Sequence, residues 1–565
     1  MTKQNSEKSG LGTKAAIIII AAVMLSAALV PFTYDTETDN TILGDGGSGI
    51  WGGASDVATE FAGGTGTLAE PYLISNGAEL AYLRVVGTGT AAVDTINGGM
   101  FNSASKYYAL TDDIYLNDTD GWELWDDLTA GLNSWIPIGG TTAAASFRGN
   151  FDGDDHAVYG MYVTGTTYRG LFGYVTGGNI CKLGIEQSYI GGTSYIGGIA
   201  GYICNNSKIS FCYNAATVEG SGFRIGGIVG QAYDNSTVTY CYNTGDVRGI
   251  GTGTGSNSIG GIAGIVNGNV SVNLSVVSNC YNLGNVSGTR VGGVVGQLNR
   301  AVLVNCYNAG TVSGSNVGGV VGYMITSNIF NVYNIGDVLT DDTGGFVVGA
   351  HSGGGTTDPS IFYLEDKTSG LLPDNAVGDD PSYGESFNDA GDLASDTLKN
   401  VLNDGRSGIV TILTGSPYNL LTIECDKWVG GEFPILEKLT VKVSLIYGDN
   451  GTASISPTEE NIAKGTAFKV TVTPDTGCIG WTVKDNGVLV LDDTDAIFTY
   501  EFVAHKGHLI VVSFQVEETG PVIGPVSDPD GNGTSAALVI LAALIIFVVL
   551  FIGWLYKRRK DEDSQ

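Results

Sequence analysis

The sequence predicts an all-β protein whose main part is a parallel β-solenoid. The first observation is a block reading Ile/Val-Gly-Gly-Ile/Val-Ala/Val-Gly, which occurs five times from Gly197 to Gly322 and a sixth time in degenerate form at Gly344–Gly349. The second is a Cys-Tyr-Asn phrase between these blocks, at Cys212, Cys241, Cys280 and Cys306, with Val332-Tyr333-Asn334 as a fifth copy. Consecutive copies are 29, 39, 26 and 26 residues apart. This period indicates units too small to bury their own apolar face, which therefore stack on one another.

Each unit consists of short β-branched runs interrupted by Gly, Asn and Ser, which is typical of strands joined by turns. We therefore expect one unit to form one coil, with neighbouring coils about 4.8 Å apart, the spacing of hydrogen-bonded strands. The longest spacing, 39 residues, is interpreted as a loop at Gly249–Asn257 that bulges from one coil.

Composition supports a packed, turn-rich protein. The chain has 565 residues, enough for two or three domains; 86 are Gly and 43% are hydrophobic, without a collagen-like triplet. The formal net charge is −31 at pH 7. Such a surface repels polyanions, which excludes nucleic acid and anionic lipid as ligands of the folded part.

Both ends of the chain carry hydrophobic segments. Three lysines precede an apolar run at Ala15–Val30, the order of a secretion signal, with an uncleaved anchor as the alternative. Ala536–Tyr556 contains 21 uncharged residues, enough to cross a ~30 Å hydrocarbon core, and Lys557-Arg558-Arg559-Lys560 follows; a buried core helix is the alternative. Because positive residues stay in the cytoplasm, we expect a single-pass plasma-membrane protein with its ectodomain at the cell surface.

Export would make glycosylation and disulfide formation relevant. Eight Asn-x-Ser/Thr sequons are candidate glycosylation sites: Asn117, Asn205, Asn235, Asn269, Asn273, Asn285, Asn450 and Asn532. Four of the eight cysteines occupy the same place in successive repeats. This placement favours a column of small buried side chains without disulfides between them.

The expected domain boundaries follow from these patterns. They are a signal peptide (1–32), a linker (33–61), an N-terminal cap with the first coils (62–160), the repeats (161–350), a C-terminal cap of the solenoid (351–437), a small β domain (438–517), a second linker (518–534), the transmembrane helix (535–556) and a cytoplasmic tail (557–565). Asn76 and Glu79 resemble a capping box, which predicts a short helix covering the first coil. Tyr107–Leu116 is interpreted as a strand pair and Leu393–Leu402 as a helical stretch.

Ordered motifs across residues 64–436 resemble a known family. They are Gly-Thr…Pro-Tyr-x-Ile, Glu-Leu-x-x-Leu, Leu-Thr-x-Asp-Ile, Trp-x-Pro-Ile-Gly, Phe-x-Gly-x-Phe-Asp-Gly and Gly-Leu-Phe-Gly, followed by the Gly-Gly…Cys-Tyr-Asn repeats. This series resembles the cell-surface proteins that bear GLUG motifs. The resemblance implies a bacterial or archaeal adhesin-like surface protein with a right-handed parallel β-helix, and it implies no catalytic residues.

The segment after the solenoid has a different pattern. Alternation in Val441–Leu445 and Phe468–Val472 predicts half-buried strands, and Lys464-Gly465 is one of several turn signals. Together with Trp481, these features resemble the divergent B-repeat domain of listerial internalins, which implies a stalk or spacer.

Candidates for chemistry are few. The fold also occurs in polysaccharide lyases and some glycoside hydrolases, which need two nearby carboxylates. The candidate cluster consists of Asp152, Asp154, Asp155 and His156, in a run typical of a turn whose carboxylates bind their own backbone. His505 and His508 lack other ligands at zinc spacing and are interpreted as a solvated turn.

Acidic turns such as Asp112-Asp113 and Asp341-Asp342 leave calcium as an alternative, although neither has the alternating oxygen ligands of a known calcium loop. The Gly-Gly blocks lack the helix and lysine of a nucleotide site. We therefore expect no catalytic residue, no metal and no cofactor.

The candidate binding residues are tyrosines that stacked coils bring into one row: Tyr213, Tyr242, Tyr281, Tyr307 and Tyr333. Strict alternation along the strand would point these rings inward. However, Asn279, Asn305 and Asn331 stand two residues before three of these tyrosines and tolerate the left-handed conformation of a one-residue corner, which would place the cysteines inside and the tyrosines outside. Phe211 and Tyr240 fit such a corner less well. We favour outward rings, with a packing ladder as the alternative.

These observations favour a membrane-anchored, cell-surface, adhesin-like binding protein that contacts extracellular polysaccharide or a surface protein of another cell. An acidic ectodomain favours a neutral polysaccharide or a protein as the ligand. On this hypothesis, replacing Tyr281 and Tyr307 by Ala weakens binding without loss of stability. The alternatives are a polysaccharide-cleaving enzyme and a structural envelope component packed against like neighbours.

Overall fold

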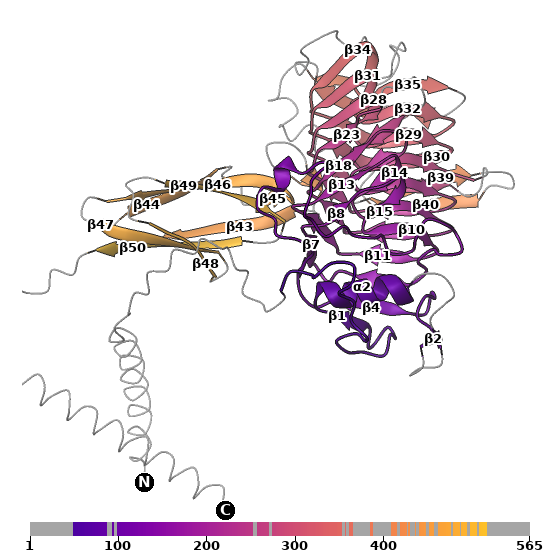
Figure 1. The fold of residues 1–565 in the computed structure, drawn as a ribbon. Coiled ribbons are helices and arrows are strands. Elements are labelled where there is room, and N and C mark those ends of the chain that lie inside the picture. The colour runs from indigo at the N-terminus through magenta and orange to yellow at the C-terminus, as the bar shows by residue number, and fades with distance from the viewer. Residues whose placement is uncertain are drawn as a thin grey trace, which may run out of the picture.

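The chain folds as a parallel β-solenoid with a smaller two-sheet β unit beside it and very little helix (Figure 1). The computed structural model describes residues 49–87, 93–94, 99–251, 257–269, 274–352, 356–357, 361–364, 385–387, 408–414, 419–425, 428–429, 435–436, 440–447, 451–456, 461–475, 478–485, 488–493, 498–505 and 508–516. The expected signal peptide, transmembrane helix, cytoplasmic tail and helical stretch at Leu393–Leu402 lie outside these residues. Within them, no helix is long and apolar enough to cross a membrane.

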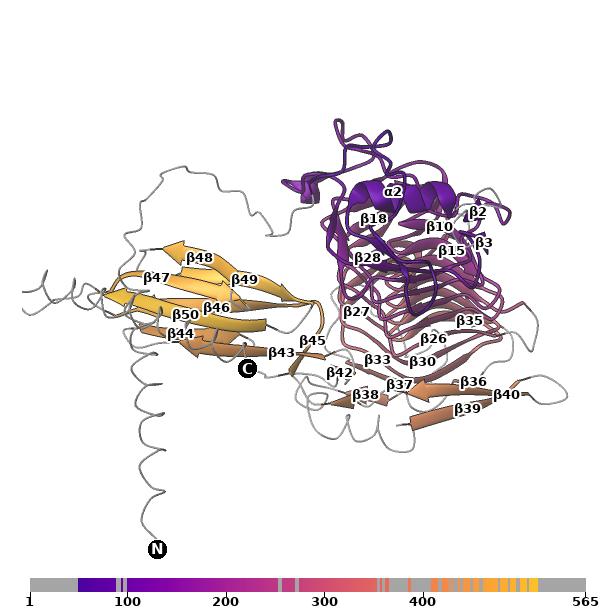
Figure 2. The same cartoon turned by 90° about the horizontal axis from the view of Figure 1, so that it is seen from below.

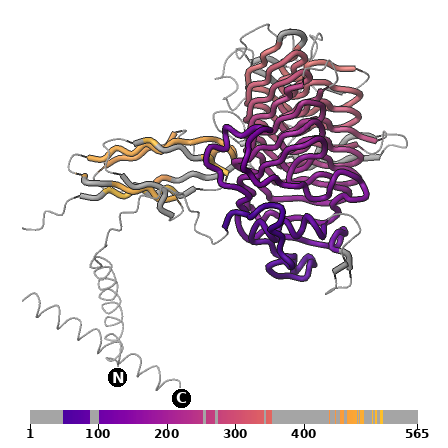
Figure 3. Tube along the Cα trace, in the orientation of Figure 1, coloured from indigo at the N-terminus to yellow at the C-terminus, as the bar shows by residue number. Residues whose placement is uncertain are grey.

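Three parallel sheets form the walls of the solenoid, and the chain winds through all three in each coil (Figure 3). The seven-stranded sheet contains β10 (Phe172–Thr176), β15 (Ala200–Cys204), β20 (Val229–Tyr233), β25 (Ala263–Asn267), β29 (Val295–Asn299), β32 (Val321–Ile325) and β35 (Val348–Ser352). The eleven-stranded sheet contains β8 (Tyr162–Val163), β9 (Thr167–Arg169), β13 (Tyr189–Gly192), β14 (Ser194–Gly197), β18 (Thr217–Gly220), β19 (Ile225–Gly226), β23 (Val247–Gly249), β24 (Ser258–Gly260), β28 (Val286–Gly292), β31 (Val312–Gly318) and β34 (Val338–Gly345).

The third wall is an eighteen-stranded sheet that runs the whole length of the stack. It contains β1 (Tyr72–Ile74), β4 (Tyr107–Leu110), β5 (Ile114–Tyr115), β6 (Asn150–Asp152), β7 (Ala157–Tyr159), β11 (Asn179–Cys181), β12 (Gly184–Glu186), β16 (Lys208–Ser210), β17 (Tyr213–Asn214), β21 (Thr237–Thr239), β22 (Tyr242–Asn243), β26 (Ser275–Ser278), β27 (Tyr281–Asn282), β30 (Ala301–Asn308), β33 (Asn328–Asn334), β36 (Thr356–Thr357), β37 (Ile361–Leu364) and β38 (Glu385–Phe387). The expected parallel stack is therefore present.

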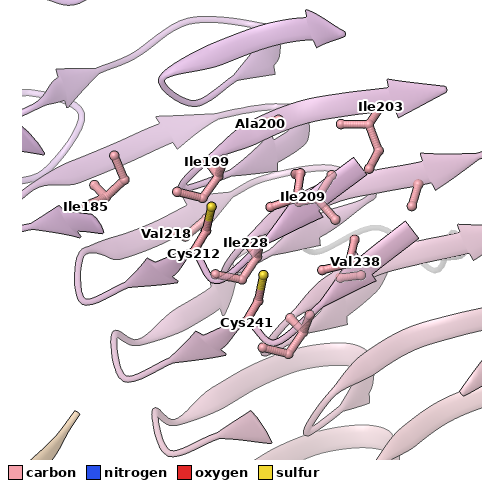
Figure 4. Packing of buried hydrophobic residues seen from close by; sticks show 14 of the residues in the cluster. Ile185, Ile199, Ala200, Ile203, Ile209, Cys212, Val218, Ile228, Val238 and Cys241 are labelled. Carbon is pink, nitrogen blue, oxygen red and sulfur yellow. The ribbon is translucent and has the colours of Figure 1, made fainter. Parts of the chain in front are cut away.

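The core lies inside the coils, where each apolar side chain contacts its equivalents above and below. Ile199 and Ile228 pack with Cys212 and Cys241 in the interior (Figure 4), and all four side chains are fully buried. Burying one such aliphatic side chain stabilises the fold by about 1.5–3 kcal/mol, so the long row of equivalents supplies the main driving force. Cys212, Cys241, Cys280 and Cys306 are all buried free thiols.

The two repeated phrases occur together because they contact each other across the coil. The Asn of each Cys-Tyr-Asn phrase points inward against the second Gly of a Gly-Gly block: a Cβ at Gly261 would lie 2.4 Å from Asn282 Oδ1. Asn282 Nδ2 donates to Asn308 Oδ1 at 2.8 Å and to Gly284 O at 2.7 Å, and Asn282 Oδ1 accepts from Asn243 Nδ2. The same bonds connect Asn214, Asn243, Asn282, Asn308 and Asn334 into one buried asparagine ladder.

The long spacing between Cys241 and Cys280 arises from two insertions. Residues that pair between neighbouring coils are separated by 29 positions in the sequence for Gly220 and Gly249. The separation is 34 positions for Ile225 and Ile259, and 39 positions for Val238 and Val277. Half of the additional residues therefore lie before β24, as expected, and the other half lie between β25 and β26. Only the first half belongs to the expected loop at 249–257, so the assignment of the whole insertion to that loop is wrong.

A helix and irregular segments close the N-terminal end of the stack (Figure 2). Helix α2 (Gly77–Val86) begins where the capping box predicts, since Asn76 Oδ1 accepts from the Glu79 amide at 3.0 Å. Glu79 Oε2 accepts from the Ser75 amide at 2.7 Å. Leu80 and Leu83 are fully buried against the first coil, which confirms the helix and its apolar face. Also at this end are β2 (Val93–Asp94), β3 (Gly99–Met100) and the 3-10 helix η1 (Trp122–Leu124).

The segment Tyr107–Leu116 does form two strands, but they do not pair with each other. Strand β4 pairs with β1 and β6, and β5 pairs with β7, so both are successive parts of one coil. In the parallel stack, their backbone groups form hydrogen bonds with strands of neighbouring coils. In a hairpin, the two strands would form these bonds with each other. At the far end, β36 to β38 continue the long sheet, followed by the hairpin β39 (Gly408–Thr414)–β40 (Asn419–Cys425) and the pair β41 (Trp428–Val429)–β42 (Ile435–Leu436).

Residues 440–516 form the C-terminal unit, whose strands make their own two sheets. One sheet contains β45 (Asn461–Ala463), β43 (Thr440–Tyr447), β50 (His508–Val516), β47 (Cys478–Asp485) and β48 (Val488–Asp493); the other contains β44 (Gly451–Ser456), β46 (Thr466–Pro474) and β49 (Phe498–Ala504). Phe468, Val470 and Val472 are buried, whereas Ala467 and Lys469 are exposed, so the alternation predicted for Phe468–Val472 is confirmed. Gly465 adopts φ +81° in the predicted turn.

Candidate functional site

The corner before each Cys-Tyr pair sets the direction of the tyrosines. Asn279, Asn305 and Asn331 have φ values of 52°, 58° and 52°, the left-handed conformation expected of them. Phe211 and Tyr240 adopt it as well, at 56° and 53°, so the expectation that they fit less well is wrong. Their rings stack on each other with centroids 4.7 Å apart, and this contact offsets the backbone strain of bulky residues in that region.

The corner places the cysteines inside the coil and the tyrosines on its outer side. Tyr213, Tyr242, Tyr281, Tyr307 and Tyr333 form a continuous ladder of parallel rings, with successive centroids 4.8 to 5.2 Å apart. They belong to a hydrophobic cluster that is separate from the solenoid core. The four rings from Tyr242 to Tyr333 are nevertheless at most 2% exposed.

The C-terminal unit covers this tyrosine ladder. Ala463 of this unit, together with Leu436 of the preceding strand β42, packs in the same cluster as the rings. Tyr281 Oη donates to the backbone carbonyl of Lys464 at 2.5 Å, in the turn between β45 and β46. A Cβ added to Gly465 would lie 2.3 Å from Thr244, which shows how closely this turn approaches the coil. In this structure the ladder is therefore an internal contact surface of the chain.

His505, directly after β49 (Phe498–Ala504), makes the most specific contact between the two parts. Its ring stacks on Tyr213 with centroids 4.3 Å apart, and its Nδ1 lies 2.8 Å from Tyr242 Oη. Its Nε2 lies 4.0 Å from Glu186 Oε1, and Glu186 also accepts a hydrogen bond from Tyr213 Oη. The interpretation of His505 as part of a solvated turn is therefore wrong, because its imidazole is bound between the C-terminal unit and the ladder.

Burial keeps the ladder hydroxyls neutral over a wide pH range. Desolvation raises the pKa of Tyr242, Tyr281 and Tyr333 well above the ordinary value, with neighbouring ionisable groups as the next cause. Desolvation likewise raises the pKa of the Cys212 and Cys280 thiols. These groups therefore contribute shape, apolar area and hydrogen bonds at neutral pH, and no charge.

The candidate acid cluster forms a turn, and the ammonium group of Lys182 lies close to two of its carboxylates. Asp152 Oδ1 accepts from the Asp154 amide at 2.9 Å, as expected of a carboxylate that binds its own backbone. Lys182 Nζ lies 3.6 Å from Asp152 and 3.5 Å from Asp154, and His156 Nδ1 lies 3.3 Å from Asp113. In the part of the chain that the structure describes, no three His, Cys, Asp or Glu side chains gather in a way that could hold a metal ion.

The sequons have different surroundings. Asn117 is 3% exposed, and its side chain donates to Gly160 O and accepts from the Asn133 amide, so a glycan there would need this contact to open. Exposed sequon residues are Asn205, Asn235, Asn269 and Asn285. Asn273, Asn450 and Asn532 lie outside the described residues.

A second group of aromatic rings, which was not predicted from the sequence, lies on the outer side of the corner between the eleven-stranded and seven-stranded sheets. We call Tyr168, Tyr174, Tyr195, Tyr202 and Arg224 the aromatic patch. Tyr168 and Tyr195 stack at 4.5 Å, Tyr174 and Tyr202 lie 4.6 Å apart, and Tyr195 meets Tyr202 edge to face at 5.7 Å. All five side chains are partly exposed.

Repetition on adjacent coils builds this patch. Tyr174 pairs in register with Tyr202, and Tyr202 with Gln231. Tyr168, Tyr195 and Arg224 occupy equivalent left-handed corners with φ of 55°, 56° and 70°. The detectable signal was a pair of tyrosines repeated at nearly the coil spacing, 168 to 195 and 174 to 202. It is weak because only two coils carry it.

Comparison with known proteins identifies one element of the chain. The family model of the GLUG motif matches residues 221–248, which hold one Gly-Gly block and one Cys-Tyr-Asn phrase. The GLUG resemblance is therefore supported, whereas no comparison supports the internalin-type B-repeat. No curated protein matches the chain. A crystal structure of a candidate immunoglobulin A1 protease from Bacteroides ovatus shares 21% identity over 67% of this chain and 98% of that chain, with a TM-score of 0.42. A likeness this weak assigns no activity.

Proposed function

We propose that the protein is a membrane-anchored, cell-surface, adhesin-like binding protein whose solenoid contacts polysaccharide or a surface protein of another cell. The GLUG motif and the parallel solenoid support this proposal. In the same proposal, the C-terminal unit is a spacer between the solenoid and the anchor at 535–556. Glycans on exposed sequon residues such as Asn235 are compatible with an outward-facing solenoid.

The observation that carries the proposal is the partly exposed aromatic patch on a rigid wall of the solenoid. Each ring is fixed by a neighbour on the same or the next coil, so little side-chain entropy is lost when a ligand binds. Tyrosines that combine an apolar face with a hydroxyl are enriched where proteins bind other molecules. The candidate acid cluster, by contrast, is bound to Lys182 and to its own backbone.

The test uses the full-length protein in nanodiscs on a glycan array, together with a reducing-sugar release assay on every glycan that binds. Retention of a glycan without release of reducing ends supports a binding protein. Release of reducing ends would favour the polysaccharide-cleaving enzyme. Binding to neither glycans nor whole cells would leave the structural envelope component as the better proposal.

Membrane anchoring has a separate test. Protease added to intact cells should remove the ectodomain and leave a short C-terminal fragment in the membrane fraction. Recovery of the full-length chain in the soluble fraction, with no membrane-bound fragment, would contradict the anchor.

A further inference from the structure

We propose that the aromatic patch is a binding site for an uncharged saccharide chain. The inference rests on the proposed function and names the site and ligand class for it. Tyr168 and Tyr195 occupy one column along the stack, Tyr174 and Tyr202 a second, and the two columns meet at edge-to-face contacts. The faces of Tyr168 and Tyr195 lie against each other and under Arg224, so a saccharide would contact the partly exposed edges and hydroxyls of the rings through its own C–H groups and hydroxyls.

The patch combines these ring edges with polar groups that can form hydrogen bonds with sugar hydroxyls. The Arg224 guanidinium lies over the Tyr195 ring, with Cζ 4.5 Å from the centroid, and continues the first column into the third coil. Its Nε is buried and has no hydrogen-bond partner among the residues that the structure describes, while the side chain as a whole is partly exposed. Desolvation raises the pKa of Tyr168, Tyr174 and Tyr202, which keeps their hydroxyls protonated and able to donate or accept.

The net charge of the protein favours uncharged saccharides over anionic ones. The chain carries a net charge of −31, so a polyanionic glycan is repelled as it approaches, and one guanidinium already bound over an aromatic face compensates little of this. An uncharged chain meets no such barrier. The two tyrosine columns run along the stack, so the saccharide lies along the stack axis and spans neighbouring coils about 4.8 Å apart.

The residues found elsewhere in the solenoid suggest substitutions that should leave the backbone conformation unchanged. Tyr202→Gln places at this site the residue that Gln231 and Gln297 carry in the same register. Tyr195→Asn keeps a residue that tolerates the left-handed corner, as Asn205 and Asn235 do with φ of 55° and 61°. Tyr323→Gln is the matched control, because Tyr323 occupies the register of Tyr202 four coils further on, where it lies under Arg290 and donates to Ser352 and is not part of the patch.

The experiment measures binding of the full-length protein in nanodiscs to uncharged gluco-, manno-, galacto- and xylo-hexasaccharides, with polygalacturonate as the anionic probe. We expect at least one uncharged probe to bind, Tyr195→Asn and Tyr202→Gln each to lower its affinity about tenfold, and Tyr323→Gln to leave it unchanged. Tyrosine nitration of the wild-type protein gives a second measurement that needs no variant: the bound probe should protect Tyr195 and Tyr202.

Three outcomes would overturn the inference. Equal affinity of wild type and both patch variants, without protection from nitration, places the saccharide elsewhere and leaves the proposed function intact. Binding of polygalacturonate alone refutes the ligand class. Absence of binding to every saccharide refutes the site and the polysaccharide arm of the proposed function together.

Discussion

At the scale of single residues, Asn282 shows what holds adjacent coils together. Its buried amide connects the coil before it to the coil after it and also caps the carbonyl of Gly284. In Asn282→Ala, these partners lose their bonds in a fully buried site, at about 1–3 kcal/mol for each unsatisfied group. We therefore expect the free energy of unfolding, measured in urea, to fall by about 3 kcal/mol or more. The control Asn285→Ala removes an exposed amide and should cost less than about 0.5 kcal/mol; similar losses in both variants would refute the ladder's role.

The cysteine column gives a second prediction at this scale. Desolvation raises the pKa of Cys280, and its thiol is fully enclosed, so iodoacetamide should not modify it in the native protein. After unfolding without reductant, Cys212, Cys241, Cys280 and Cys306 should all be alkylated, as mass spectrometry would show. A peptide that links Cys280 to Cys306 would contradict the prediction. The sequence indicated this column because the cysteines share one repeat position, whereas the asparagine ladder beside it was missed, since Asn was interpreted only as a turn former.

At the scale of elements, the tyrosine ladder makes stability depend on alkaline pH. The ordinary pKa of Tyr is about 10, and burial raises the pKa of Tyr281 and Tyr333 in the folded state. Above pH 10 the unfolded state therefore releases protons first and binds fewer than the native state, so stability falls as pH rises. We expect urea unfolding from pH 8 to 11 to show this loss and Tyr333→Phe to reduce its slope. An equal slope in the variant would show that Tyr333 does not contribute.

The coils that carry this ladder show which features of an element can be predicted from the repeats in the sequence. The spacing of the repeats predicted parallel coils, and the backbone preference of Asn predicted the left-handed corners at Asn279 and Asn305. The corners at Phe211 and Tyr240 could not be predicted, since their strain is offset by a stacking contact between coils. The second insertion, between β25 and β26, could not be predicted either. The spacing between two Cys-Tyr-Asn phrases gives the number of additional residues but not their position in the coil.

At the scale of the whole molecule, the sequence predicted two parts but not their contact. Tyr242 and His505 lie 263 residues apart, and no periodicity relates a turn of the C-terminal unit to a column on the solenoid. Outward tyrosines were therefore interpreted as a ligand surface, whereas the C-terminal unit covers them. A partner that binds this ladder would first have to displace the chain's own β45–β46 turn and His505.

His505 is accordingly the residue whose removal should separate the two parts. His505→Ala removes the stack on Tyr213 and the hydrogen bond to Tyr242, and Tyr281→Phe removes the bond to the Lys464 carbonyl. Interfaces between domains are usually small, so losing these contacts should free the C-terminal unit. We expect small-angle scattering of the double variant to show a larger radius of gyration, while the solenoid's thermal transition is retained. The control Lys469→Ala, an exposed change in the same unit, should alter neither the radius of gyration nor the thermal transition. An unchanged radius of gyration in the double variant would show that His505 and Tyr281 do not hold the unit against the coils.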